Sequence, residues 1–244
     1  MHRVLILPQT VQRDEIIIDD PRNVHHLVRV LRITRGDRVE CFDGAGRTYR
    51  GRVTQVGGRQ LTVSVDQRRE EPSPRVKLTL AQSLIQPARF EWVLQKATEL
   101  GVARITPVVT SRTTVRASSL GAGQRAQRWR RIVTEATAQC GRATLPLLDD
   151  PQRFEDVLQT FASRYVLLPT LAVSGAPLEE HVRQLTGASE VIILIGPEGD
   201  FSPEEVSLAQ RAGAHPATLG AVALRSETAA LATLAILQHA LGLL

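Results

Sequence analysis

The chain has 244 residues, of which 43% are hydrophobic and 23% are charged, and these proportions are ordinary for a globular protein. This length suffices for a sizeable core, either in one large domain or in a small domain joined to a medium one. The formal net charge of +5 leaves polyanions open as partners. The two cysteines, Cys41 and Cys140, lie far apart, which argues against a disulfide framework or a zinc ribbon and predicts a reduced, cytoplasmic protein.

Neither a signal peptide nor a membrane span is expected. Residues 1–8 contain no extended apolar stretch followed by a small-residue cleavage site. The most apolar run, residues 229–244, is interrupted by polar side chains and falls short of the roughly 18–20 residues that a spanning helix needs. We therefore predict a buried helix there.

Residues 1–70 predict a small β-rich unit. Residues 38–43, 48–56 and 60–65 alternate between hydrophobic and polar side chains, and glycine-containing turns separate them. Residues 24–31 predict one short helix. A small barrel or sandwich follows from this pattern.

A linker is predicted at residues 71–75, because the segment around it is charged and then broken by prolines. From residue 76 onward, strands and helices alternate. The strands are expected at 76–80 and 102–109, and the helices at 87–100 and about 124–140, each helix ended by a glycine.

Two continuous apolar runs follow, at residues 165–168 and 191–195. Such runs are typical of strands that are covered on both faces. Together with the alternation of strands and helices, they indicate that residues 76–244 form an α/β domain with a mainly parallel sheet.

Arginine is concentrated between residues 104 and 142, where a single acidic residue, Glu135, occurs. The arginines of this segment are Arg104, Arg112, Arg116, Arg125, Arg128, Arg130, Arg131 and Arg142. Guanidinium groups match phosphate geometry, so the segment could neutralise several phosphates. A solvated helix face would show the same pattern, and charge alone does not separate the two interpretations.

The first informative motif, residues 194–205, reads Leu-Ile-Gly-Pro-Glu-Gly-Asp-Phe-Ser-Pro-Glu-Glu. Ser202 and Glu205 have the spacing of a capping box at a helix start, with Pro203 in the first helical position. The turn before it, Gly196 to Gly199, follows a buried strand, where ligands bind in open α/β sheets. It matches neither a P-loop nor a dinucleotide fingerprint, and an ordinary β–α turn is the alternative.

The second motif, residues 219–230, reads Leu-Gly-Ala-Val-Ala-Leu-Arg-Ser-Glu-Thr-Ala-Ala. Gly220 would allow a ligand close to the backbone. Arg225 stands at the start of a long helix, where the helix dipole disfavours positive charge. An anion is expected to offset it, either Glu227 in a simple surface pair or a bound group.

The two motifs resemble the cofactor loops of the SPOUT RNA methyltransferases, most closely those of the ribosomal RNA small-subunit methyltransferase E family. Beyond Gly196 to Gly199, the matching positions are Leu219, Gly220, Leu224, Arg225, Glu227, Thr228 and Ala229. Ala223 stands where the family usually has isoleucine. Residues 95–102, 128–129 and 135–146 resemble the middle of the family, and residues 26–46 resemble its N-terminal domain, so the resemblance covers nearly the whole chain.

The resemblance implies a PUA-like RNA-binding β-barrel over residues 1–70 and a trefoil-knotted α/β methyltransferase domain over residues 76–244. It implies S-adenosylmethionine as the cofactor and a homodimer as the assembly. The implied cofactor-binding residues are Leu168, Pro169, Ile195, Gly196, Pro197, Glu198, Gly199, Leu219, Gly220, Leu224, Glu227, Thr228 and Ala229.

The implied reaction is methylation of N3 of a uridine in the 16S rRNA of the small ribosomal subunit. Arg225 is the candidate catalytic cation, and neither Glu198 nor Glu227 is singled out as the base. The candidate RNA-binding residues are Arg22, Arg29, Arg32, Arg112, Arg128 and Arg142. The alternatives are another RNA position, such as a ribose 2′-hydroxyl, or a non-catalytic ribosome-assembly factor. The six histidines show no ligand spacing, so no metal site is expected.

Overall fold

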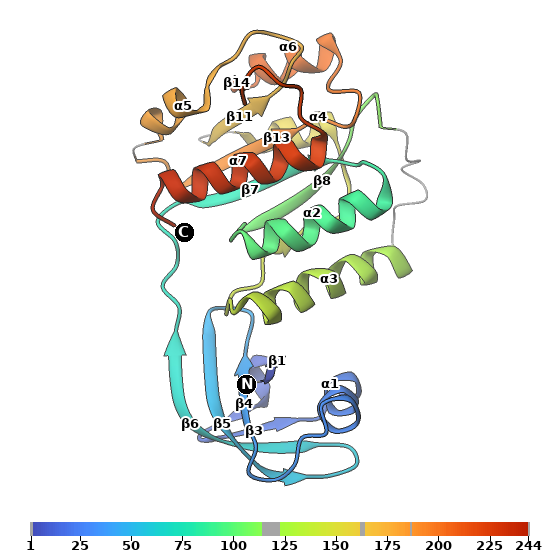
Figure 1. Ribbon diagram of the computed structural model, residues 1–244, viewed down its shortest axis with the longest axis vertical. Coiled ribbons are helices and arrows are strands. Elements are labelled where there is room, and N and C mark those ends of the chain that lie inside the picture. Colours follow the sequence, from blue (N-terminus) through green and yellow to red (C-terminus); the bar gives the residue numbers. More distant parts are fainter. Residues whose placement is uncertain (1, 114–122, 162–163, 186, 244) are drawn as a thin grey trace. The chain divides into compact units, whose positions relative to one another are not determined.

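The computed structural model describes residues 2–113, 123–161, 164–185 and 187–243 (Figure 1). The chain divides into two compact units, one of residues 1–73 with 137–145 and one of residues 74–136 with 146–244. The first unit therefore includes residues 137–145, which the sequence-based division assigns to the second.

The first unit contains a six-stranded sheet in the order β1-β4-β5-β6-β3-β2. The strands are β1 (His2–Leu5), β2 (Val11–Gln12), β3 (Glu15–Ile18), β4 (Arg38–Phe42), β5 (Arg47–Val56) and β6 (Leu61–Glu70). Neighbouring strands are antiparallel, except that β1 pairs with β4 in parallel. The three strands predicted here are confirmed, and β6 continues five residues beyond its predicted end at residue 65.

The helical segment of this unit differs from the prediction of one helix. A five-residue helix, α1 (Pro21–His25), is followed by a π-helical turn, η2 (His26–Val30). Asp20 caps α1, because its carboxylate accepts hydrogen bonds from the backbone nitrogens of Arg22 and Asn23 at 3.1 and 2.9 Å. A short 3-10 turn, η1 (Pro8–Thr10), lies between β1 and β2.

An ion-pair network around the buried carboxylate of Glu40 joins β1, β4 and β5 within this unit. The carboxylate of Glu40 meets Arg3 Nε at 2.6 Å and Arg50 Nε at 2.5 Å. The Arg3 guanidinium also donates to the carbonyls of Thr137, Ala138 and Arg142. Burial raises the pKa of Glu40, but the hydrogen bonds from the two arginines outweigh it, so the pKa lies below its ordinary value.

The second unit is built on an eight-stranded sheet in the order β10-β8-β7-β13-β11-β14-β12, with β9 paired to β8. The strands are β7 (Lys77–Ser83), β8 (Arg104–Val109), β9 (Leu147–Leu148), β10 (Gln152–Arg153), β11 (Tyr165–Pro169), β12 (Ala176–Pro177), β13 (Glu190–Ile195) and β14 (Ala214–Thr218). Every strand pair recorded in this sheet is parallel. The predicted mainly parallel sheet is therefore confirmed.

Helices cover both faces of this sheet. They are α2 (Pro87–Glu99), α4 (Phe154–Leu158), α5 (Leu178–Gln184), α6 (Pro203–Arg211) and α7 (Ser226–Ala240), with a 3-10 turn, η4 (Gln159–Phe161), after α4. A further helix, α3 (Gln124–Cys140), packs against α2 through the rings of Trp129 and Phe90 and ends in the first unit. Figure 1 shows α2 and α7 side by side on one face. Within the described residues, no helix combines the length and the apolar character that crossing a membrane requires.

The core on the other face joins alternate residues of the central strands to α4 and α6. Leu168 and Leu194 are fully buried there, and Val157 and Val206 pack from the helices. Because β11 pairs in parallel with both β13 and β14, the carboxyl ends of these three strands meet at one edge of the sheet. The loops that leave this edge, at residues 169–171, 196–200 and 219–225, build the candidate site.

Candidate active site

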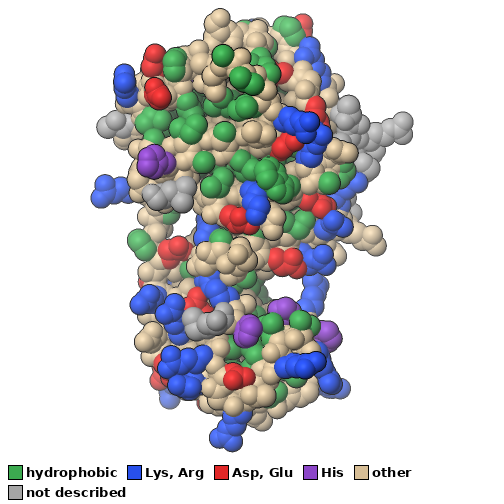
Figure 2. Space-filling model, viewed as in Figure 1, with side chains coloured by type: hydrophobic (Ala, Val, Ile, Leu, Met, Phe, Trp, Pro, Cys, Tyr) green, Lys and Arg blue, Asp and Glu red, His purple; other side chains and the backbone are tan. Residues whose placement is uncertain are grey.

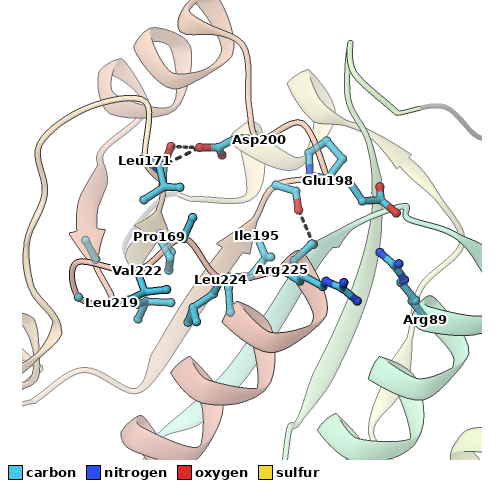
Figure 3. Close-up of a pocket in the computed structure, with 18 residues that line it drawn as sticks. Arg89, Pro169, Leu171, Ile195, Glu198, Asp200, Leu219, Val222, Leu224 and Arg225 are labelled. Carbon is cyan, nitrogen blue, oxygen red and sulfur yellow. Dashed lines mark hydrogen bonds between the residues drawn. The ribbon is translucent and has the colours of Figure 1, made fainter.

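A cavity of about 540 Å³ opens at the carboxyl edge of the parallel sheet, which is within the usual range for small-molecule sites. The predicted residues that line it are Pro169, Ile195, Gly196, Pro197, Glu198, Leu219, Gly220, Leu224, Arg225 and Ala229. Figure 3 shows the lining residues converging from three loops and from the start of α7. The structure thus brings the two sequence motifs together around one pocket.

The turn after β13 requires glycine at position 196. A Cβ atom added there would lie 2.9 Å from Asp200 Oδ1 and 3.2 Å from both Asp200 Cα and Phe201 Cδ2. Asp200 closes the turn by donating its backbone N–H to the Pro197 carbonyl at 3.0 Å. The backbone of this turn is therefore held against the pocket, with no room for a side chain at its first residue.

Asp200 links this turn to the loop after β11. Its Oδ2 atom accepts hydrogen bonds from Thr170 Oγ1 at 2.8 Å and from Leu171 N at 3.0 Å (Figure 3), and its Oδ1 atom accepts from Phe201 N at 2.8 Å. Asp200 itself adopts a left-handed φ of 57°, which aspartate tolerates better than most residues. Two walls of the pocket are thereby fixed to each other.

Ser226, at the start of α7, fixes the same turn from the other side. Its hydroxyl donates to the Gly196 carbonyl at 2.5 Å (Figure 3) and accepts from Gln82 Nε2 at 2.9 Å. All three residues are buried. This chain of hydrogen bonds joins the end of β7, the turn after β13 and the first residue of α7.

The predicted capping box at the start of α6 is confirmed. Ser202 Oγ accepts from Glu205 N at 3.2 Å, and Glu205 Oε2 accepts from Ser202 N at 2.9 Å. The other carboxylate oxygen of Glu205 accepts from Ser111 N at 2.7 Å. Next to it, Arg112 donates to the Gly199 carbonyl at 2.6 Å. Arg112, a candidate RNA-binding residue, is thus engaged in holding the pocket turn.

One end of the pocket is apolar. Leu171, Val222 and Leu224 line it, and these residues remain 65%, 74% and 37% exposed. Gly220, in the same loop, has a φ of +112°, a conformation that side chains with a Cβ rarely adopt. An apolar ring could lie among these side chains while its polar edges reach the loop backbone.

The other end of the pocket is charged. Figure 3 shows Arg225, Arg89 and Glu198 grouped there. Glu198 Oε1 accepts from the backbone nitrogen of Gln86, just before α2, at 3.1 Å. Glu227 is buried and faces Arg89, with 3.6 Å between Oε1 and Nε. The simple Arg225–Glu227 surface pair is therefore wrong, and no ion pair of Arg225 is found among the residues that the structure describes.

Four predicted cofactor residues do not line the cavity. Leu168 is fully buried in the core, and Gly199 is exposed beside Arg112. Glu227 and Thr228 lie in the first turn of α7, where Glu227 is buried. The lining residues that were not among the predicted site residues are Arg89, Thr170, Leu171, Asp200, Ala217, Val222, Ala223 and Ser226. Of these, Asp200, Val222, Ala223 and Ser226 lie within the two motifs.

The candidate RNA-binding arginines occupy different settings. Arg22, Arg29 and Arg32 are exposed in the first unit, whose visible face carries many basic side chains (Figure 2). Arg128 meets Glu91 at 2.6 Å, and this hydrogen-bonded pair raises the pKa of its guanidinium. Arg142 is half-buried, and burial lowers its pKa.

Two other expectations from the sequence concern the rest of the arginine-rich segment and a metal site. Arg116 of the arginine-rich segment lies outside the described residues. Across the described ranges, no group of three or more histidine, cysteine or acidic side chains could hold a metal ion.

Two family models match the chain. The first, described as an RNA methyltransferase domain, covers residues 71–238, and the second, an RNA methyltransferase PUA domain, covers residues 18–66. The chain is 31% identical to ribosomal RNA small subunit methyltransferase E of Synechocystis over 96% of its own length and 76% of the relative. It is 29% identical to the enzyme of the same name from Bacillus subtilis, over 91% and 89% of the two chains.

Solved structures are similar over almost the whole chain. A putative methyltransferase from Legionella pneumophila in complex with S-adenosylmethionine is 30% identical, with a TM-score of 0.86 over 98% of this chain and 97% of that one. Ribosomal RNA small subunit methyltransferase E from Neisseria gonorrhoeae, also bound to S-adenosylmethionine, is 27% identical, with a TM-score of 0.83 over the same shares.

Proposed function

Because the chain belongs to the ribosomal RNA small subunit methyltransferase E family of SPOUT methyltransferases, we propose that it methylates N3 of a uridine in 16S rRNA. The methyl donor is S-adenosylmethionine, and the substrate is the small ribosomal subunit. The observation that carries this proposal is the pocket itself, which two separate motifs build at the carboxyl edge of the sheet.

The pocket residues fit the proposed cofactor. The apolar end, with Leu219 and Leu224, suits an adenine ring, and the backbone of the two glycine-containing loops suits its polar edges. Gly196 leaves no space for a side chain, so the turn backbone itself forms the wall. We propose that the lining residues hold the cofactor, whereas Leu168 acts behind them as core.

S-adenosylmethionine supplies an activated methyl group, so the chain's own residues have to position the acceptor and manage its proton. N3 of a neutral uridine carries a proton and becomes a good nucleophile only once that proton is lost. The site therefore needs a proton acceptor and a cation near the developing negative charge.

Arg225 is proposed as that cation, because it is exposed at the charged end of the pocket and carries no ion pair within the described part of the chain. Of the two candidate bases, Glu198 lines the pocket, whereas Glu227 is directed to Arg89. Glu198 is therefore the better-placed acceptor for the N3 proton.

RNA recognition is assigned to the first unit, which matches an RNA methyltransferase PUA domain. Arg22, Arg29 and Arg32 are exposed there and free to approach phosphates.

We also propose a homodimer, because the second unit exposes large hydrophobic side chains, among them Trp92 and Ile236 on α2 and α7. Figure 2 shows hydrophobic side chains gathered over these two helices. We propose a cytoplasmic location, because the proposed substrate is a ribosomal subunit.

Two assays on the purified chain test the proposal. Calorimetry should show binding of S-adenosylmethionine, and labelled methyl groups should pass to small subunits that lack their native uridine methylation. Cofactor binding without transfer would indicate a different RNA substrate. The absence of binding would instead support a non-catalytic RNA-binding role.

A further inference from the structure

The charged end of the pocket contains a cation that the sequence motifs do not include. Arg89 lies in the first turn of α2 and lines the same cavity as Arg225, although 136 positions separate them in the sequence. Its side chain is 35% exposed. Figure 3 shows the Arg89 and Arg225 side chains reaching the same end of the pocket from two different helices.

This arrangement is electrostatically unfavourable for the chain alone. Arg89 and Arg225 stand at the N-terminal ends of α2 and α7, where helix dipoles disfavour positive charge. The two like charges share this end of the pocket with Glu198, and Glu227 lies beside Arg89. When Glu198 takes up a proton, an anion bound between the two arginines would replace the lost negative charge.

The one carboxylate paired with Arg89 is incompletely satisfied. Glu227 Oε1 lies 3.6 Å from Arg89 Nε, whereas Glu227 Oε2 is buried without a hydrogen-bond partner. A buried, unpaired oxygen is costly. The contrast is Glu40 in the first unit, where both oxygens meet arginines, at 2.6 and 2.5 Å. A pair retained only for packing would be expected to resemble that of Glu40.

The terminal nitrogens of Arg89 are available to a ligand. Among the described residues, the recorded contact of Arg89 with a carboxylate joins its Nε to Glu227 Oε1 at 3.6 Å, and no hydrogen bond of Nη1 or Nη2 is recorded. Glu227 thus lies beside the guanidinium without occupying its terminal nitrogens by hydrogen bonds. A guanidinium fork suits a planar anion with oxygens as acceptors.

We infer, on the basis of the proposed function, that Arg89 is a second catalytic cation for the methyl-acceptor base and that Glu227 is its positioning residue. The N3 proton passes to a carboxylate oxygen of Glu198, and the negative charge spreads over N3 and the two carbonyl oxygens beside it. Arg89 and Arg225 stabilise this anion. As N3 bonds to the methyl carbon, the bond from that carbon to the sulfonium sulfur would break, with its electron pair staying on sulfur. The negative charge of the base is then neutralised, so the two arginines favour the deprotonated base over both the neutral reactant and the product.

The test compares Arg89→Ala with a matched control, Arg164→Ala. Arg164 also has a side chain that is 35% exposed, and it pairs with Glu190 at 2.8 Å, but it precedes β11 at the opposite edge of the sheet. Both variants lose one arginine and one ion pair of the second unit. Only Arg89 lies at the pocket.

We expect kcat of Arg89→Ala on small subunits to fall about 100- to 1000-fold, with the calorimetric Kd for S-adenosylmethionine unchanged. The pH dependence of kcat is the readout that a structural role would not move. Removing a cation raises the pKa of uridine N3 in the bound substrate. The rise of kcat with pH should therefore shift by about one unit toward higher pH. Arg164→Ala should leave kcat, Kd and the pH profile as in the wild type.

Arg89→Lys covers the case in which the alanine variant fails to fold, because it keeps the charge beside Glu227 but loses the fork. Its kcat should fall about tenfold with the cofactor Kd unchanged. A wild-type kcat in both Arg89 variants would overturn the inference, as would parallel loss of cofactor binding or an equal loss of kcat at every pH. Failure of the proposed function would appear separately, as wild-type protein that transfers no methyl group, and the inference would fall with it.

Discussion

Replacing Gly220 by alanine tests whether the backbone of the 219–225 loop belongs to the cofactor site. Gly220 has a φ of +112°, and a Cβ added there meets no atom within 4 Å. The penalty therefore comes from the backbone conformation alone. For a residue with a side chain it amounts to about 1–3 kcal/mol.

The location of Gly220 decides where this penalty appears. Gly220 and the residues after it are exposed, and the recorded hydrogen bonds of its backbone go to the Thr218 side chain, at 3.2 and 3.3 Å. The loop can therefore relax in the free protein without unfolding the domain. Cofactor binding must then restore the strained conformation, which weakens the affinity by about 5- to 150-fold.

Gly213→Ala is the matched control. Gly213 has a φ of +96° and equally open surroundings, but it follows α6 outside the pocket, and its N–H donates to the Gln210 carbonyl at 3.0 Å. Here the same penalty should reduce the free energy of unfolding, lowering the Tm by about 2–4 °C per kcal/mol. The Kd for S-adenosylmethionine should not change.

Calorimetry with S-adenosylmethionine, together with thermal unfolding of both variants, makes the comparison. An unchanged Kd in Gly220→Ala would refute the assignment of this loop to the cofactor site. Equal losses of affinity in the two glycine variants would refute it as well, because they would show a general effect of destabilisation.

The remaining predictions concern one residue each. Arg225→Ala should lower kcat about 100- to 1000-fold while the calorimetric cofactor Kd stays unchanged, and equal losses in both would give Arg225 a binding role. Asp200→Asn, which weakens the hydrogen bonds between two pocket walls, should raise the cofactor Kd by about tenfold, and an unchanged Kd would contradict that link. Glu40→Gln should destabilise the first unit in urea by about 3 kcal/mol. In the wild type, the contribution of Glu40 to the free energy of unfolding is complete above its ordinary pKa of 4.5 and is lost as the pH falls through the lower folded-state pKa. The variant lacks this carboxylate, so its free energy of unfolding should fall less than that of the wild type between pH 6 and pH 3. An equal fall in the two proteins would contradict the network.

The parts of the site that the sequence predicts are those in which the interacting residues are close together along the chain. The turn from Gly196 to Gly199 and the Ser202–Glu205 capping box lie within a few residues of each other, so backbone chemistry alone indicates them. The parallel sheet follows from two apolar runs. The trefoil knot implied by the family resemblance stays a prediction, because hydrophobic periodicity carries no information on chain threading.

The parts of the site that were missed depend on contacts across the fold. Asp200 meets Thr170 and Leu171 from another strand end, and Arg89 reaches the pocket from a helix whose apolar face was its only visible signal. Strand β14 contains His215 and Pro216 without alternation, so its position beside β11 could not be predicted. Arg112 and Arg128 show how a basic run can also serve internal contacts.

The most direct test of the account is to identify the nucleoside formed when the wild-type chain transfers labelled methyl groups to unmethylated small subunits. Mass spectrometry after digestion should detect N3-methyluridine, at a level that Arg225→Ala reduces at least 100-fold. A 2′-O-methylated nucleoside, or N3-methyluridine at equal levels with both proteins, would contradict the proposed reaction at this pocket.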